Sequence, residues 1–300
     1  MTVVVIGTVG IDDIETPMAG VQGVLGGSAT YACMAARHFA PTTLTSVVGD
    51  DFPPAFRQQL ERLAIDLRGL AVARGKTFRW GGRYHANLNQ RDTTFVDLNV
   101  LRDFDPQVPR HATSGSYVFL GNTDPLIQLR ILEQVRDPRF VVVDSMNFWI
   151  QSKRDALAGV FRRASVVVLN EEEIRLFSGI HGLPRAVASL LALGPAAVVV
   201  KRGEYGAAMV TRDGWFFAPG FPLHEVVDPT GAGDSFAGAF LGSLAECGRT
   251  DPEALRRAVV YGSVAASFTV EAFGVDRLCA VTRADLDARF GEFHRMVAFA

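Results

Sequence analysis

The segment VDPTGAGDSFAGA, residues 227–239, joins a loop of small residues to the start of an apolar helix. Gly231, Ala232 and Gly233 lack side chains large enough to cover their backbone N–H groups. The N-terminus of a helix carries a partial positive charge, so these groups form a candidate anion site. Apolar residues then recur at helical spacing, at Phe236, Phe240, Leu241 and Leu244.

Asp234 places a negative charge next to this candidate anion site. A carboxylate beside an anion site repels a bound phosphate. It is useful there as a general base, which takes a proton from an attacking hydroxyl while the loop amides stabilise a transferred phosphoryl group. The alternative is structural, because Asp is a favoured N-cap and glycines make turns. Spacing alone leaves both interpretations open.

Residues 228–236, DPTGAGDSF, resemble the C-terminal signature D-x-x-G-A-G-D-x-F of the ribokinase-like (PfkB) family of carbohydrate and nucleoside kinases. The resemblance favours the catalytic interpretation of Asp234. It implies that Gly231, Ala232 and Gly233 surround the transferred phosphoryl group and that Asp228 belongs to the nucleotide site. It also implies ATP and Mg²⁺ as cofactors. Monovalent-cation activation, known in parts of the family, stays open.

Composition restricts the class of partner. The chain has 300 residues, of which 48% are hydrophobic and 21% charged, as in an ordinary globular protein with a sizeable core. A net charge of −2 provides no general attraction to nucleic acid or to an anionic membrane, so we expect a small-molecule partner. Three scattered cysteines and the lack of a leader or membrane-length apolar run predict a cytoplasmic protein.

Short β-branched runs alternate with helical patterns along much of the chain. Continuous apolar strands separated by helices predict an α/β fold with a parallel sheet covered on both faces. The predicted strands are Val3–Ile6, Tyr117–Leu120, Phe140–Val143, Val166–Leu169 and Ala197–Val200. The predicted helices among them are Pro125–Val135, Lys153–Arg163, Glu171–Phe177 and Pro184–Leu193, and Val259–Gly274 is largely helical in pattern. Polar or glycine residues after several strands predict one shared cleft at their carboxyl ends.

Two segments interrupt this alternation. Residues 11–25 contain Gly and Asp with weak periodicity, and residues 77–100 alternate as antiparallel strands do. A surface hairpin is the simple interpretation. The family resemblance instead implies a small β-sheet lid over the active site, which would exclude water from phosphoryl transfer. The lack of a linker or internal repeat predicts a single ribokinase-like domain, residues 1–300, in which these segments form the lid.

Two early motifs are candidates for substrate binding. Asp12 follows the first strand and aligns with a family acid that binds substrate hydroxyls; a carboxylate accepts hydrogen bonds from two vicinal hydroxyls. Gly26 and Gly27 match the family pattern G-G-x-x-x-N, and their backbone can approach a ligand closely. Tyr31 stands where that pattern has Asn, so it either contacts a different substrate or fills the core.

The segment Asn170-Glu171-Glu172-Glu173 has two interpretations. Asn170 and Glu173 have the spacing of a helix capping box, which is the simpler interpretation. The family has an N-x-x-E motif at this place, which implies that Asn170 and Glu173 help to place the nucleotide phosphates and Mg²⁺ through water. Mg²⁺ keeps several of its waters in proteins, which agrees with an indirect role for Glu173.

Lys201-Arg202-Gly203-Glu204-Tyr205-Gly206 follows a predicted strand and resembles the nucleotide-binding turn of the family. Lys201 is a candidate for neutralising phosphate, although solvation at the surface is the commoner fate of such a residue. Gly203 and Gly206 are candidates for close backbone approach to the nucleotide.

These features together predict a kinase that transfers the γ-phosphoryl group of ATP to a hydroxyl of a small sugar or nucleoside. Aromatic residues in the lid weakly favour a nucleoside; they are Phe78, Trp80 and Tyr84. The alternative is a sensor of the same fold that binds a nucleotide or sugar without catalysis. Family members often dimerise through the lid, so the resemblance also raises a homodimer through the lid, which the sequence alone leaves open. P-loop, dinucleotide-binding and protein-kinase motifs are absent from the sequence.

Overall fold

A computed structural model describes residues 1–298, and their strands form two sheets. The strands of the larger sheet are β1 (Val3–Ile6), β4 (Thr42–Gly49), β5 (Asp66–Ala73), β8 (Tyr117–Leu120), β9 (Phe140–Val143), β10 (Val166–Asn170), β11 (Ala197–Lys201), β12 (Ala207–Thr211) and β13 (Gly214–Ala218). Their order across the sheet is β13-β12-β11-β10-β9-β8-β1-β4-β5. The strands from β11 to β5 are parallel, and β12 and β13 add an antiparallel edge.

Helices cover both faces of this sheet, as the run of apolar strands predicts. They are α1 (Ser28–Ala36), α2 (Pro54–Arg62), α3 (Pro125–Gln134), α4 (Asn147–Ser152), α5 (Arg154–Phe161), α6 (Glu171–Ser178), α7 (Leu183–Leu191), α8 (Ala232–Cys247), α9 (Pro252–Thr269), α10 (Asp276–Ala280) and α11 (Arg283–Val297). Short 3-10 turns lie at η1 (Asn99–Asp103), η2 (Arg110–Ala112) and η3 (Gly203–Tyr205).

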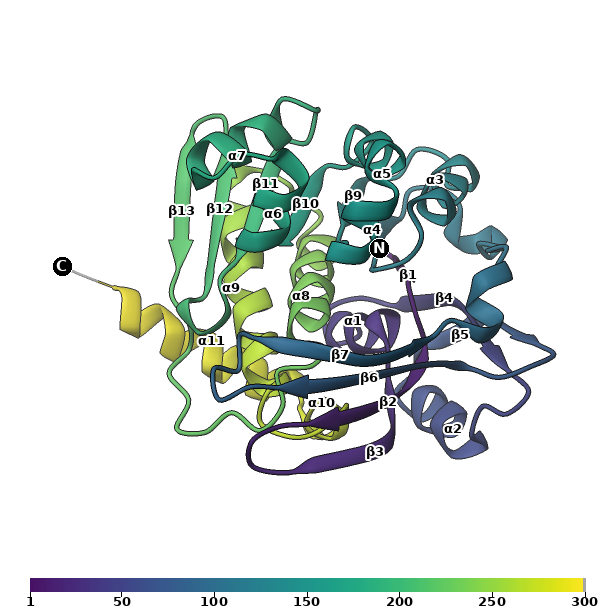
Figure 1. Cartoon of the computed structure of the whole chain (residues 1–300). Coiled ribbons are helices and arrows are strands. Elements are labelled where there is room, and N and C mark those ends of the chain that lie inside the picture. Colours follow the sequence, from purple (N-terminus) through teal and green to yellow (C-terminus); the bar gives the residue numbers. More distant parts are fainter. Residues whose placement is uncertain (299–300) are drawn as a thin grey trace.

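Strand β1 shows how the two cores form. Val3 and Val5 pack into a core with α1, α8 and α9, whereas Val4 and Ile6 pack into a second core with α3, α5, α6 and α7. Successive strand residues point to opposite faces, so a run of four apolar residues stabilises both cores at once. Figure 1 shows the two groups of helices on either side of the sheet.

The five strands and four helices predicted along the chain are all present, with ends that differ by a few residues. Strands β4, β5, β12 and β13 were not predicted. β4 reads TTLTSVVG, and its threonines and serine hide a strand that is buried along its whole length. β12 and β13 form an antiparallel hairpin at the sheet edge, outside the alternating pattern.

The second sheet contains both segments that interrupted the alternation. Its strands are β2 (Gly10–Glu15), β3 (Gly20–Gly26), β6 (Phe78–Tyr84) and β7 (Arg91–Asp97), in the order β3-β2-β6-β7. The pairs β2–β3 and β6–β7 are antiparallel as expected, but β2 and β6 pair in parallel. Figure 1 shows this small sheet below and in front of the large one, crossing near α1 and α8. We refer to it as the lid sheet.

Among residues 1–298, no helix combines the length and the apolar character that crossing a membrane requires.

Candidate active site

The glycine-rich loop leads into α8 as the sequence predicts. Gly231 has a φ of 76°, a conformation that favours glycine, and α8 begins at Ala232. The N–H of Ala232 donates to the carbonyl of Pro229 at 3.2 Å. Within residues 1–298 the N–H groups of Gly231, Gly233 and Asp234 have no hydrogen-bond partner. The expectation for Ala232 is therefore corrected: a local turn occupies its amide, and the free donors are its neighbours.

Asp234 lies in the first turn of α8 and keeps only part of its surface exposed. The pKa of its carboxyl is raised to about 7, first by burial and then by the negative charge of Asp144. The positive charges of Lys201 and Arg91 act in the opposite direction. A carboxylate with a pKa near neutrality is suited to accept a proton from a hydroxyl.

Lys201, the last residue of β11, lies beside the anion loop. Its Nζ is 2.7 Å from Oδ2 of Asp144, which follows β9. A Cβ placed on Gly233 would lie 3.0 Å from the same Nζ, so glycine gives the ammonium group room next to the loop. Lys201 is thus a half-buried cation at the loop, while the neighbouring Arg202 turns away and pairs with Glu171 at 2.8 Å.

Asn170 and Glu173 form the capping box that their spacing suggested. The Glu173 N–H donates to Oδ1 of Asn170, and the Asn170 N–H donates to Oε2 of Glu173, both at 2.8 Å. Glu173 is also buried, and its pKa is raised to about 7. Burial is the main cause, the charge of Lys201 opposes it, and the charge of Asp144 adds to it. The two interpretations are therefore compatible, because the cap places Glu173 among the charged groups around the loop.

Arg91 is a charged residue of this region that the sequence analysis did not identify. It is the first residue of β7 and lies directly opposite Tyr84 of β6. Its guanidinium carbon lies 5.2 Å from the centre of the Trp80 ring. Its charge lowers the pKa of both Asp234 and Glu173, so a cation of the lid sheet acts on both carboxyls.

Asp12 is on β2 of the lid sheet and is 3% exposed. Its carboxylate lies where a side chain on Gly26 would be, 1.9 Å from a Cβ built there, so only glycine fits opposite it. Within residues 1–298 its Oδ1 has no hydrogen-bond partner. Burial raises its pKa to about 8, and the charges of Asp228 and Asp234 contribute, which places Asp12 near the glycine-rich loop.

Gly27 and Tyr31 place α1 against this loop. Gly27 has a φ of 93° and caps α1, and a Cβ there would lie 2.5 Å from the carbonyl of Thr8. Tyr31 is 1% exposed, and a Cβ on Gly231 would lie 2.3 Å from its ring carbons. Tyr31 therefore supports the glycine-rich loop from beneath, which excludes stacking of its ring on a substrate.

Asp228 holds the glycine-rich loop in shape. Its Oδ1 accepts the Thr230 N–H at 2.8 Å and its Oδ2 accepts the Gly274 N–H at 3.1 Å. The carboxylate is 1% exposed. The role of Asp228 in nucleotide binding stays a prediction. In the structure its carboxylate fixes the backbone at Thr230 and Gly274.

The predicted nucleotide turn lies under the tip of the lid sheet. Gly203 and Gly206 have φ values of 56° and 89°. Asn89, between β6 and β7, donates from Nδ2 to Glu204 at 3.2 Å, and its Oδ1 occupies the place of a Cβ on Gly203. The lid sheet therefore contacts this turn as well as the glycine-rich loop.

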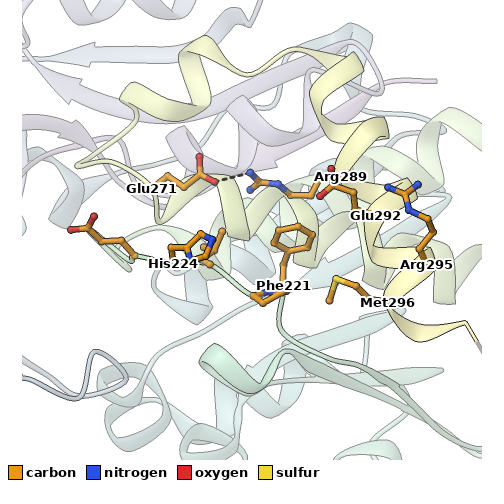
Figure 2. A pocket seen from close by; sticks show the side chains of 10 residues that line it. Phe221, His224, Glu271, Arg289, Glu292, Arg295 and Met296 are labelled. Atoms are coloured by element: carbon orange, nitrogen blue, oxygen red, sulfur yellow. Dashed lines mark hydrogen bonds and ion pairs between the residues drawn. The ribbon is translucent and has the colours of Figure 1, made fainter.

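A separate surface cavity of about 790 Å³ lies between the loop Phe221–Glu225 and α11. Figure 2 shows Arg289 pointing across it to Glu271, with Phe221 alongside. None of the site residues predicted from the sequence lines it. Within the part of the chain that the structure describes, no group of three or more His, Cys, Asp or Glu side chains is arranged to hold a metal ion.

Comparison with known proteins identifies relatives that align with most of this chain. A cytidine kinase of Thermococcus kodakarensis is 30% identical, and the alignment covers 85% of this chain and 95% of the relative. A nucleoside kinase of Methanothermobacter thermautotrophicus is 26% identical, with 82% and 78% covered. The solved nucleoside kinase of Methanocaldococcus jannaschii, a member of the ribokinase family, superposes with a TM-score of 0.78 at 22% identity, covering 97% of this chain and 98% of that one.

A nucleoside kinase of Burkholderia thailandensis, solved in complex with inosine, superposes with a TM-score of 0.79 at 17% identity, and 97% of each chain is covered. These superpositions confirm the predicted ribokinase-like fold. The model of the pfkB family of carbohydrate kinases matches residues 2–282. The resemblance found in the sequence is thereby confirmed, and the chain belongs to the pfkB family of carbohydrate kinases.

Proposed function

We propose that the protein is a nucleoside kinase that transfers the γ-phosphoryl group of ATP to a sugar hydroxyl of a nucleoside. The observation that carries the proposal is the position of Asp234, a carboxyl with a pKa of about 7. It lies in the same helical turn as the N–H of Gly233, which has no hydrogen-bond partner among residues 1–298. A base and anion-binding donors at one place are what transfer of a phosphoryl group to a hydroxyl requires. The relatives named as cytidine and nucleoside kinases, aligned over more than four-fifths of this chain, favour a nucleoside over a simple sugar.

In the proposed reaction Asp234 accepts the proton of the acceptor hydroxyl. The hydroxyl oxygen forms a bond to the γ-phosphorus as the bond from that phosphorus to the bridging oxygen breaks, and ADP leaves with the electron pair. The N–H groups of Gly231 and Gly233 donate to the transferred group while its charge is redistributed. Asp12 accepts hydrogen bonds from other hydroxyls of the substrate and so orients it.

Two cations complete this arrangement. Lys201 lies beside Gly233, and Arg91 approaches from the lid sheet. Both charges lower the pKa of Asp234, which shows that they act on the same small region. We assign to both the neutralisation of phosphate oxygens. Gly203 and Gly206 give the nucleotide close access to the backbone, and Asp228 is a positioning residue for the loop.

The residues present fit an indirectly held Mg²⁺. Glu173 is a buried carboxyl whose pKa is raised by burial and by Asp144, so a nearby cation would stabilise its ionised form. Asn170 fixes its orientation. Glu173 and Asn170 would hold the ion through water, and when bound it would supply positive charge to the phosphates of ATP. The need for a monovalent cation stays open.

An assay of ADP release with Mg-ATP tests the function. The panel contains cytidine, inosine and adenosine, with ribose and fructose as sugars, and each is repeated with Asp234→Asn. We expect turnover of a nucleoside that falls about 10²- to 10⁴-fold in Asp234→Asn, while calorimetry shows that the variant still binds the nucleoside. Asp213→Asn, an exposed carboxylate on the β12–β13 turn, is the matched control and keeps full activity.

Three results contradict the proposal. Near wild-type turnover by a folded Asp234→Asn variant would show that Asp234 is not the general base. ATP binding without phosphorylation of any nucleoside would exclude nucleosides as the substrate class. Turnover of ribose or fructose alone would identify a sugar kinase instead.

A further inference from the structure

Strand β13 leaves one edge of the larger sheet open. It is the last strand in the sheet order, and within residues 1–298 no strand pairs with its outer edge (Figure 1). An open edge is a template for another strand, so soluble proteins usually protect it with charged residues, proline or a bulge. β13 reads GWFFA and pairs with β12 without a register shift. None of the usual forms of protection is present in this strand.

The hairpin that joins β12 to β13 determines which backbone groups of the edge are free. Thr211 and Gly214 are partners across a two-residue turn, so they exchange both of their backbone hydrogen bonds. Along an antiparallel pair, such partners alternate with residues whose N–H and C=O groups point outward. The outward-facing residues of β13 are Trp215 and Phe217. Within residues 1–298 no loop or helix supplies a partner for their N–H groups.

The same two residues carry the exposed apolar surface of the strand. Trp215 is 39% exposed and Phe217 is 59% exposed, and their rings stack with centroids 5.7 Å apart. Because residues two apart in a strand lie on the same face, both rings extend the same surface of the sheet. Adjacent large apolar side chains on a protein surface mark an interaction site. Free backbone groups and a preformed aromatic pair therefore occur together at this edge.

A second copy of β13 satisfies all of these groups at once. When two copies run antiparallel around a two-fold axis at Phe216, Trp215 of each copy lies opposite Phe217 of the other. These are the residues with free N–H and C=O groups, so each of those groups gains a hydrogen-bond partner. The rings of both copies then lie on one face of a continuous sheet, where aromatic cross-strand neighbours stabilise the pair.

The charges beside the strand fit the same register. It places Arg212 of one copy opposite Gly220 of the other. The backbone of Glu204 occupies the place of a Cβ on Gly220, so Glu204 is next to that position. Arg212 and Glu204 are both exposed and have opposite charges, and their long side chains can meet across the interface. The two-fold axis repeats this pair at the other end.

We propose that the open edge of β13 is a dimerisation surface on which a second copy of this chain extends the larger sheet. Trp and Phe side chains bury about 150–250 Å² each, so the exposed parts of these rings in two copies amount to roughly 400 Å². A stable dimer buries about 1,200 Å² or more in total. The strand backbones and the flanking turns supply the rest, which predicts a dimer of moderate affinity with a Kd in the micromolar range.

Sedimentation velocity of the full chain, at concentrations below and above the micromolar range, measures this dimer. We expect the wild type to change from monomer to dimer as its concentration rises. Phe217→Glu places a charge in each half of the interface and should raise the Kd about tenfold or more. Val96→Glu is the matched control, because Val96 is an exposed apolar residue of β7 on the lid sheet, and it leaves the Kd unchanged.

Charge variants test the register of the two strands. Arg212→Glu brings like charges together and should raise the Kd. Arg212→Glu combined with Glu204→Arg restores opposite charges in both halves and should recover most of the affinity.

Cysteine variants test the register covalently. Phe216→Cys lies on the two-fold axis opposite its own copy, at a Cα separation of about 4.5 Å, which a disulfide spans. Phe217→Cys lies diagonally from its own copy, about 7–8 Å away, which is too far. Mild oxidation should therefore link Phe216→Cys into a covalent dimer and leave Phe217→Cys unlinked. The wild type, with its exposed Cys247, gives the background.

Two results would overturn the proposal. One is a wild type that stays monomeric at the highest concentration. The other is a dimer that Val96→Glu dissociates and Phe217→Glu leaves intact, because its contact would then be the lid sheet. If Phe216→Cys does not fold, the comparison of Phe217→Glu with Val96→Glu still decides, since both changes are at exposed side chains.

Discussion

Tyr84 Oη and Thr230 Oγ1 lie 3.0 Å apart, so the lid sheet is hydrogen-bonded to the loop that precedes α8. Tyr84 is the last residue of β6 and is 6% exposed. The N–H of Thr230 donates to Asp228, which shapes the same loop. The position of the lid sheet and the geometry of the anion site are therefore linked through one side-chain contact.

Loss of this contact should weaken lid closure without unfolding the protein. Tyr84→Phe removes only the hydroxyl, so we expect kcat to fall about 3- to 10-fold, the range for one buried hydrogen bond. Hydrogen exchange of residues 78–97 in the substrate-bound enzyme should become faster. Tyr117→Phe is the control. Unchanged exchange and unchanged kcat would show that Tyr84 does not hold the lid.

The raised pKa of Asp234 predicts a pH profile with a definite sign. The base is active when ionised, so below its pKa of about 7 the value of kcat/KM should fall about tenfold per pH unit and should level off above it. The groups that face Asp234 are Asp144, Lys201, Arg91 and Glu173. The slope is measured with the nucleoside as the varied substrate between pH 5.5 and about 8.5.

Variants of two of these groups should move the profile in opposite directions. Arg91→Met removes a positive charge, raises the pKa of Asp234 and moves the midpoint to higher pH. Asp144→Asn removes a negative charge and moves the midpoint to lower pH. Arg83→Met, on the same lid sheet but paired with Glu15 at the surface, leaves the midpoint unchanged. Parallel shifts in both variants would show that another group controls the profile.

Motifs with local meaning could be predicted from the sequence. The glycines at 231 and 233 and the acid at 234 lie within a few residues of each other, so their positions on one helical turn follow from spacing alone. Asn170 and Glu173 likewise have the local geometry of a cap. Ala232 shows the limit of this approach. Its N–H donates a hydrogen bond to the carbonyl of Pro229, and the sequence does not reveal that bond.

Residues brought in by long-range packing could not be predicted in the same way. Arg91 follows a polar turn and resembles any surface arginine in sequence. Its charge acts on Asp234, and its position on the lid sheet comes from the pairing of β7 with β6. Asp144 follows β9 directly, but its partner Lys201 is 57 residues away in the chain. In β4, buried Thr and Ser replace the apolar run that identifies the other central strands.

Variants of the Lys201–Asp144 ion pair should distinguish its contribution to stability from that of Lys201 to catalysis. Lys201→Met leaves the carboxylate of Asp144, only 5% exposed, without its cation, so we expect the free energy of unfolding in urea to fall by about 3–5 kcal/mol. Lys201→Met combined with Asp144→Asn removes the unpaired charge and should recover most of that stability.

The double variant still lacks the cation beside Gly233, so its kcat/KM for ATP should stay about 10²-fold or more below the wild type. Arg83→Met breaks an exposed pair and should cost less than about 1 kcal/mol. A double variant as unstable as the single one, or one with wild-type activity, would show that Lys201 serves only to pair with Asp144.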